Sequence, residues 1–96
     1  MNQLNSVIIE GNITETDYSD GLCTFTVENI RKYTYEGETI IERNKIEVHY
    51  VGKAADRLSP ELRKERGVRV VGRLKQNEKI ILIAEHVELK PWKVSA

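Results

Sequence analysis

LNSVIIEGNIT at residues 4–14 and IAEHVEL at residues 83–89 are apolar stretches in a 96-residue chain of which 31% is charged. The run Val7-Ile8-Ile9, continued by Ile13, is typical of a β-strand, and Gly11 predicts a bend or bulge within it. The second stretch belongs to a strand that we expect from Ile80 to Leu89. These are the first and the last strand of the predicted domain, and the fold class depends on the elements predicted between them.

Two further strands are predicted from the alternation of apolar and polar residues between these segments. Turn-forming residues at 17–21 separate the first strand from the next one, in which Cys23, Phe25 and Val27 share one face. A second turn, at residues 36–38, leads into a strand over residues 39–51. In that strand the core face carries Ile46, Val48 and Tyr50, and the outward face carries Lys45, Glu47, His49 and Val51.

One helical segment is predicted, over residues 53–66. Its apolar face, at a spacing of four residues, is formed by Ala54, Leu58 and Leu62. Ser59 followed by Pro60 has the pattern of an N-cap and a first-turn proline, so we expect the helix to break and restart there. Gly67 suits the C-terminus of the helix.

The order of elements defines the fold class. A fourth strand over residues 68–74 and a tight turn at residues 76–78 complete five strands, with one short helix between the third and the fourth. This order predicts an all-β, five-stranded Greek-key barrel of the OB-fold type, which commonly binds single-stranded nucleic acid. We expect one domain over residues 1–90 and a short C-terminal tail over residues 91–96.

Composition restricts the function classes. Fifteen Lys and Arg residues balance fifteen Asp and Glu residues, so a nucleic-acid-binding surface must come from the placement of charges. The single cysteine, Cys23, excludes an internal disulfide, and its position beside Phe25 predicts a buried thiol. The start has no signal-peptide pattern, and the longest apolar run, at residues 80–84, is too short to span a bilayer. We therefore expect a cytoplasmic, nucleoid-associated protein without membrane contact.

Five short motifs follow one another over residues 4–89. They are Asn5 to Thr14, Gly21 with Phe25-Thr26-Val27, Gly52-Lys53-Ala54-Ala55-Asp56, Arg66-Gly67-Val68-Arg69-Val70-Val71-Gly72-Arg73-Leu74, and Leu82 to Leu89. Each motif is weak alone, but in this order they resemble the DNA-binding domain of bacterial single-stranded DNA-binding proteins. The resemblance implies an OB fold, binding of single-stranded DNA, and a homo-oligomer, usually a tetramer built from dimers.

The chain departs from that family at the DNA-contacting positions. Lys45 and Val51 stand where family members place aromatic residues, and Lys79 lies near the matching position of the last hairpin, which is also short here. The acidic, Pro-Phe-ending tail that recruits partners in the family does not occur in residues 1–96. The chain therefore resembles a short, divergent member, and it also resembles the short primosomal OB-fold proteins.

Cations and aromatic residues in two hairpins and one strand form the predicted binding surface. Single-strand binding needs cations that follow the phosphates and flat rings that stack on bases. The outward face of the second and third strands, with the hairpins beside it, should form one groove that is more basic than the whole chain. The predicted DNA-binding residues are Arg31, Lys32, Tyr33, Tyr35, Lys45, His49, Arg73, Lys75 and Lys79. Four acids in the same region oppose this prediction: Glu28, Glu36, Glu38 and Glu47.

The aromatic residues and the histidines have structural alternatives. Tyr33 and Tyr35 either pack the hairpin or stack on bases, and Trp92 caps the barrel, enters a subunit contact or stacks on a base. His49 and His86 lack Cys or His neighbours in the sequence, so we expect no metal and no cofactor. Enzyme signatures, such as a Gly-rich phosphate loop or a nucleophile motif, do not occur, so we expect a protein that is not an enzyme.

The resulting functional prediction is sequence-independent binding of single-stranded DNA, in replication, recombination or repair. We expect a homodimer or homotetramer, formed by pairing of exposed first strands at a sheet edge, with replication or repair proteins as candidate partners. The alternative is a primosome-like or other complex-assembly OB fold that acts mainly through protein–protein contacts. The zero net charge and the missing aromatic residues favour that alternative, and RNA binding also stays open.

Overall fold

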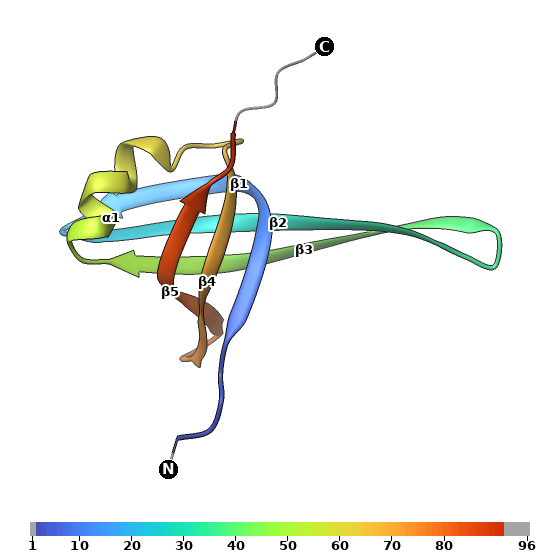
Figure 1. The fold of residues 1–96 in the computed structure, drawn as a ribbon, viewed down its shortest axis with the longest axis horizontal. Coiled ribbons are helices and arrows are strands. Elements are labelled where there is room, and N and C mark those ends of the chain that lie inside the picture. The colour runs from blue at the N-terminus through green and yellow to red at the C-terminus, as the bar shows by residue number, and fades with distance from the viewer. Residues whose placement is uncertain (1, 92–96) are drawn as a thin grey trace.

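The structure, a computed structural model, describes residues 2–91. Five strands enclose the core, with one helix and one 3-10 turn between the third strand and the fourth (Figure 1). The elements are β1 (Val7–Ser19), β2 (Leu22–Tyr35), β3 (Glu38–Val51), α1 (Lys53–Leu58), the 3-10 turn (Ser59–Glu61), β4 (Gly67–Gln76) and β5 (Ile80–Leu89). The alternatives for Trp92, and the predicted tail apart from Pro91, fall outside the described residues.

The five strands close into a barrel in the order β1-β2-β3-β5-β4, which confirms the predicted OB-fold architecture. Strands β3 and β5 pair in parallel, and all the other neighbours are antiparallel. β1 pairs with β4 through Val7–Asn12 and with β2 through Asn12–Ser19. β1 as a whole lies between β4 and β2, but residues 7–11 pair only with β4 and residues 13–19 pair only with β2. Within the described residues, each of these two segments therefore has one edge without a paired strand, which agrees with the sheet edge predicted for the first strand.

Two glycines allow backbones to approach closely where strands change partners. Gly11 lies where β1 passes from β4 to β2, and a Cβ atom there would collide with the carbonyl oxygen of Glu28. At Gly72, opposite the bulge in β5, a Cβ atom would collide with the carbonyl oxygen of Ile83. Gly11 is therefore needed for close approach, while the bulge in β1 lies further along the strand, between Ile13 and Glu15.

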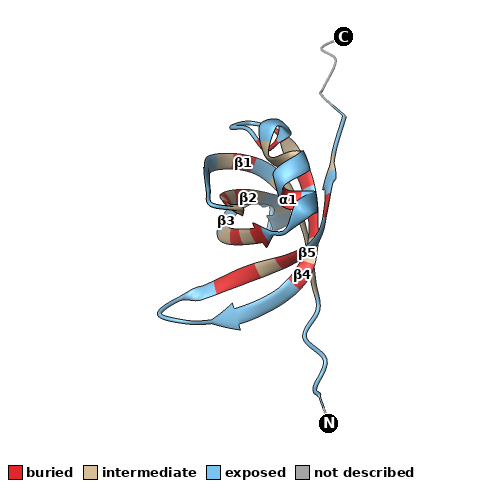
Figure 2. Ribbon diagram, turned by 90° about the vertical axis from the view of Figure 1, so that its left-hand side faces the viewer, coloured by how far each residue is buried: buried red, intermediate tan, exposed pale blue. Residues whose placement is uncertain are grey.

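The core follows the predicted alternation. Cys23, Phe25 and Val27 on β2 are fully buried, as are Val48 and, almost completely, Tyr50 on β3. Buried positions on β4 and β5 complete the barrel interior: Val68, Val70, Leu82, Ala84 and Val87. Figure 2 shows this pattern in the projecting β4–β5 hairpin, where β5 is largely buried and the end of β4 is exposed.

The helical segment is shorter than predicted, and its buried face differs. Ala55 is buried together with Leu62, whereas its neighbour Ala54 is exposed. The helix breaks at Ser59–Pro60 as predicted, but Ser59 is not an N-cap: its hydroxyl donates to the carbonyl oxygen of Asp56 at 3.1 Å. Pro60 has no N–H for that carbonyl, so the Ser59 hydroxyl satisfies it instead.

The predicted role of Gly67 at the end of the helix is also wrong. Gly67 begins β4, and the residue with a left-handed backbone before that strand is Glu65, at φ 72°. The backbone between the 3-10 turn and β4 is tied to the first strand, because the Glu65 N–H donates to the Ile13 carbonyl oxygen at 2.6 Å. This long-range hydrogen bond fixes the non-helical backbone that connects the 3-10 turn to β4.

Strands β2 and β3 continue beyond the barrel as a two-stranded extension, residues 29–44, which we call the arm (Figure 1). Every residue of β2, from Leu22 to Tyr35, pairs with β3 without a register shift. The arm ends in a turn at Glu36 and Gly37, both with positive φ, and the molecule is 48 Å along its longest axis. An unbroken register means that residues two apart along the arm stay on the same side of it.

Candidate nucleic-acid interface

The outward face of β3, β5 and β4 is one continuous surface. Val48 pairs with Leu82 and both are fully buried, so the adjacent pair, His49 and Ile83, faces outward. Ile83 in turn pairs with Arg73, and two residues along the hairpin Ile81 pairs with Lys75. The register therefore brings together five of the nine predicted site residues on or beside this face, which we call the outward face: Lys45, His49, Arg73, Lys75 and Lys79.

A carboxylate stands among these cations. The Lys79 ammonium donates to Glu47 Oε1 at 2.7 Å, and His49 Nε2 lies 2.6 Å from Glu47 Oε2. The hydrogen bond from Lys79, and after it the contact with His49, holds the pKa of Glu47 below its usual value, and the same hydrogen bond raises the pKa of Lys79. Two predicted site residues, Lys79 and His49, thus contact Glu47, one of the four acids that oppose the predicted DNA binding.

A second carboxylate occupies the base of the arm. Glu28 Oε1 lies 3.4 Å from Arg43 and Glu28 Oε2 lies 4.0 Å from Lys45, while the acid itself is largely buried. Arg43 was not among the predicted residues, although its place two residues before Lys45 puts it on the same side of β3. In the described part of the chain, Arg73 and Lys75 form no ion pair, so they are the cations of this face that stay available.

The opposite margin of the surface is acidic. An open hollow of about 150 Å³ between β1 and β2 is lined by threonines and three carboxylates. The carboxylates are Glu15, Asp17 and Glu47. Acids of β1 and β3 thus border the cations of the outward face on this side, so the groove that was predicted to be basic carries charges of both signs.

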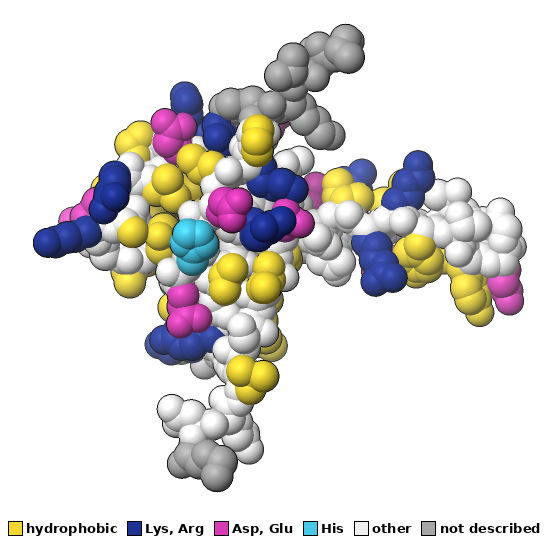
Figure 3. Space-filling model, viewed as in Figure 1, with side chains coloured by type: hydrophobic (Ala, Val, Ile, Leu, Met, Phe, Trp, Pro, Cys, Tyr) yellow, Lys and Arg dark blue, Asp and Glu magenta, His cyan; other side chains and the backbone are white. Residues whose placement is uncertain are grey.

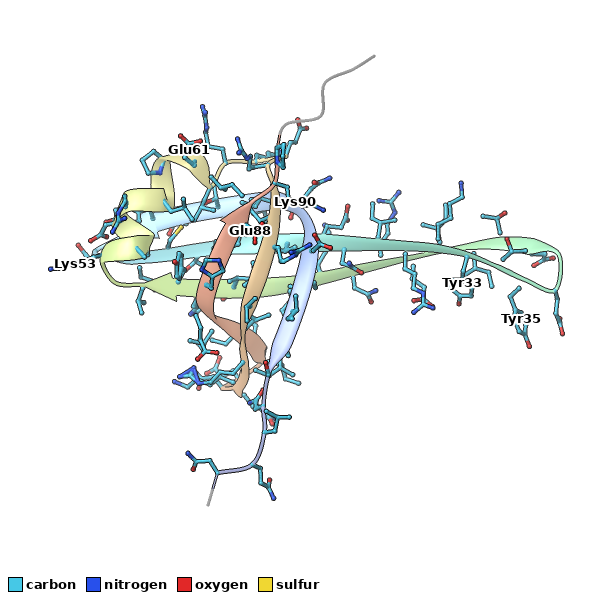
Figure 4. All side chains as sticks on the ribbon, in the orientation of Figure 1. Tyr33, Tyr35, Lys53, Glu61, Glu88 and Lys90 are labelled. Atoms are coloured by element: carbon cyan, nitrogen blue, oxygen red, sulfur yellow. The ribbon has the colours of Figure 1, made fainter. Side chains whose placement is uncertain are left out.

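The arm separates the remaining predicted residues by face. Side chains an even number of positions from the buried Val27 lie on the same side of β2 as Val27. That side, which faces the core within the barrel, carries Arg31, Tyr33 and Tyr35 in the arm. Figure 4 shows both tyrosines projecting from the same side of the arm. Lys32 lies on the other side, where Ile30 and Ile41 are 50% and 54% exposed. The tyrosines and Lys45 therefore do not share one groove face, contrary to the prediction.

The tyrosine side of the arm has its own polar contacts. The Arg31 guanidinium lies 5.4 Å from the centre of the Tyr33 ring, and the Tyr33 hydroxyl donates to Glu42 Oε1 at 2.9 Å, which raises the pKa of Tyr33. Tyr35, near the tip, is 61% exposed. Along the arm, Lys and Arg side chains alternate with apolar ones (Figure 3). Exposed rings beside cations are able to stack on bases and meet phosphates.

In residues 2–91, His, Cys, Asp and Glu side chains do not form a group of three or more that could hold a metal ion. Within the same range, no helix has the length and hydropathy needed to cross a membrane.

Comparison with known proteins shows where this fold has been seen. No protein-family description matches the chain, and no curated protein matches it significantly. Among solved structures, a deletion mutant of the single-stranded DNA binding protein from Thermus aquaticus superposes with a TM-score of 0.76 at 20% identity, covering 94% of this chain and 52% of that one. This chain thus spans about half of that protein.

Two further solved structures match this chain over almost the whole length of both proteins. Plasmodium falciparum SSB in complex with single-stranded DNA superposes with a TM-score of 0.76 at 16% identity, over 95% of this chain and 98% of that one. The protein PriB from Ralstonia solanacearum gives a TM-score of 0.69 at 14% identity, over 91% and 98%. The predicted resemblance is confirmed in the fold: this chain has the OB fold of single-stranded DNA-binding proteins.

Proposed function

We propose that this chain binds single-stranded DNA with little sequence preference, in replication, recombination or repair. One observation carries the proposal: the register of β3, β5 and β4 gathers Lys45, His49, Arg73, Lys75 and Lys79 on one outward face of an OB barrel. The arm beside it adds exposed Tyr35 and the cations Arg31 and Lys32. The mechanism is reversible binding, in which cations neutralise phosphates and release counterions while rings stack on bases.

The first expected result is that single strands bind better than duplex. Labelled oligo-dT bound to the protein should be displaced by unlabelled oligo-dT but much less by duplex of equal length, because stacking needs unpaired bases. Competition is followed by fluorescence anisotropy at fixed ionic strength, with unlabelled oligo-U as a third competitor to compare RNA with DNA. Equal displacement by duplex and single strand contradicts the proposal.

Salt dependence provides the control for that experiment. A strand that meets four of these cations should give a slope of about −3 in log affinity against log salt, at roughly 0.7 for each single-strand phosphate contact. An affinity that does not change with salt concentration contradicts a surface that follows the phosphates.

The second expected result concerns association. The 7–11 segment of β1 has an edge without a paired strand in the described residues, and Ile8 on it is 67% exposed. Such an edge is able to pair with the same segment of a second copy, so we expect a dimer or a tetramer at micromolar concentration. Light scattering on the purified protein measures the mass, and Ile8→Lys is the variant that should lower it. A monomer mass for the parent chain contradicts this expectation.

A second candidate function is assembly of a protein complex, with DNA contact weak or absent. It is favoured by the acidic hollow at the margin of the outward face and by the exposed Ile30 and Ile41 on the arm. The fold is also shared with the protein PriB. The oligo-dT titration separates the two functions, because a complex-assembly protein should show no salt-dependent binding of single strands.

A further inference from the structure

One carboxylate of the outward face, Glu47, engages a lysine and a histidine of the same face. Glu47 is about a quarter exposed, and both of its oxygens are engaged, Oε1 by the Lys79 ammonium and Oε2 by His49. Lys79 comes from the β4–β5 turn, 32 residues away in the chain, so the contact exists only because the barrel brings that turn against β3. The Lys79 side chain is 67% exposed and therefore free to change partners.

A carboxylate in this position resembles a phosphate in the two properties that matter for binding. It is an anion, and it offers two oxygen acceptors to an ammonium and an imidazole, as a phosphodiester does. An ion pair with an exposed lysine contributes little to stability, so a phosphate is able to replace the carboxylate at low cost. The displaced carboxylate would stay beside Glu15 and Asp17, which line the same hollow and oppose an approaching strand.

We propose that Glu47 is an intramolecular competitor for the phosphates of a bound single strand and lowers the affinity of the outward face by occupying Lys79 and His49. This inference rests on the proposed single-strand binding. It assigns to Glu47 a role in setting affinity: the strand exchanges one anion for another at this point, so that binding is weaker and release faster than the number of cations suggests. Neutralising Glu47 should strengthen binding, which is the opposite of the effect expected for a residue that contacts DNA favourably.

The test uses Glu47→Gln, which keeps the size of the side chain and one acceptor oxygen and removes its charge. Binding of oligo-dT should become about two- to fivefold tighter at low salt, corresponding to the worth of an exposed ion pair. The slope of log affinity against log salt should become steeper by about 0.7, since one more phosphate contact forms. Thermal melts and light scattering establish that the variant has the fold and mass of the parent.

Glu10→Gln is the matched control. Glu10 also binds two cations, Lys90 at 2.8 Å and Arg69 at 3.1 Å, but it pairs with the start of β4, at the end of that strand away from Lys75 and the β4–β5 turn. Its replacement changes the net charge by the same amount, so any effect of overall charge is shared. A gain for Glu47→Gln no larger than the gain for Glu10→Gln overturns the inference.

The double variant Glu47→Gln with Lys79→Gln tests the partner. If the gain comes from the released ammonium, the double variant should return close to the affinity of the parent chain. A gain that persists without Lys79 overturns the inference while leaving single-strand binding intact. Failure of the proposed function looks different, because then neither the parent nor any variant binds oligo-dT in a salt-dependent way, and both proposals are overturned together.

Discussion

A chain in which Tyr33 and Tyr35 are both replaced by alanine should bind oligo-dT about 2–6 kcal/mol more weakly than the parent, at about 1–3 kcal/mol for each stacking ring. Both tyrosines project from one side of the arm, with the Arg31 guanidinium over the Tyr33 ring. A base stacked there would place its phosphate near a cation. The loss is measured by titration of fluorescent oligo-dT.

The control variant replaces Ile30 and Ile41, which lie on the other side of the arm and are 50% and 54% exposed. Their double alanine variant should retain the affinity of the parent, because aliphatic side chains do not stack on bases. A thermal melt of both double variants shows that the fold is intact. If the tyrosine variant is well folded and binds as the parent does, then the rings only pack the arm, and the complex-assembly function becomes the better explanation.

The second large effect is expected in the core. Phe25 is 1% exposed and is the largest fully buried side chain of the barrel. Phe25→Ala should lower the free energy of unfolding by about 3–5 kcal/mol, through lost burial and the cavity left behind. A domain of this size has a total stability of about 5–15 kcal/mol, so the variant should unfold at a much lower urea concentration.

The comparison for that result is Tyr35→Ala, which removes an aromatic ring that is 61% exposed. Surface substitutions of this kind usually change stability by less than about 0.5 kcal/mol. Urea denaturation followed by circular dichroism gives both values. A loss for Phe25→Ala no greater than that for Tyr35→Ala would show that the barrel interior is not the main source of stability.

Several features of the fold were predictable because they depend on neighbours in the sequence. Period-two alternation identified the buried faces of β2 and β3, and the bounds predicted for β5, Ile80–Leu89, agree with the structure. The break at Ser59–Pro60 was also predictable, since proline lacks the N–H that a continuing helix needs.

Other features could not be predicted locally. Ala54 and Ala55 are adjacent, and a helix of six residues is too short for periodicity to show which one is buried; the packing of α1 on the barrel decides it. The left-handed residue before β4 is Glu65, and it is held there by its hydrogen bond to Ile13, far away in the sequence. The change of partner along β1, from β4 to β2, could not be predicted locally either, because barrel closure is a non-local event.

The sequence by itself determined the order of strands, the inward and outward residues of each, and the set of cations and rings available for binding. Only the tertiary structure decided which of them meet. The register between β2 and β3 placed Arg31, Tyr33 and Tyr35 on the opposite side of the sheet from Arg43 and Lys45, and barrel closure brought Lys79 to Glu47. The physical reason is that alternation is a property of one strand, whereas the pairing of charges depends on the register between strands and on how closely turns approach them.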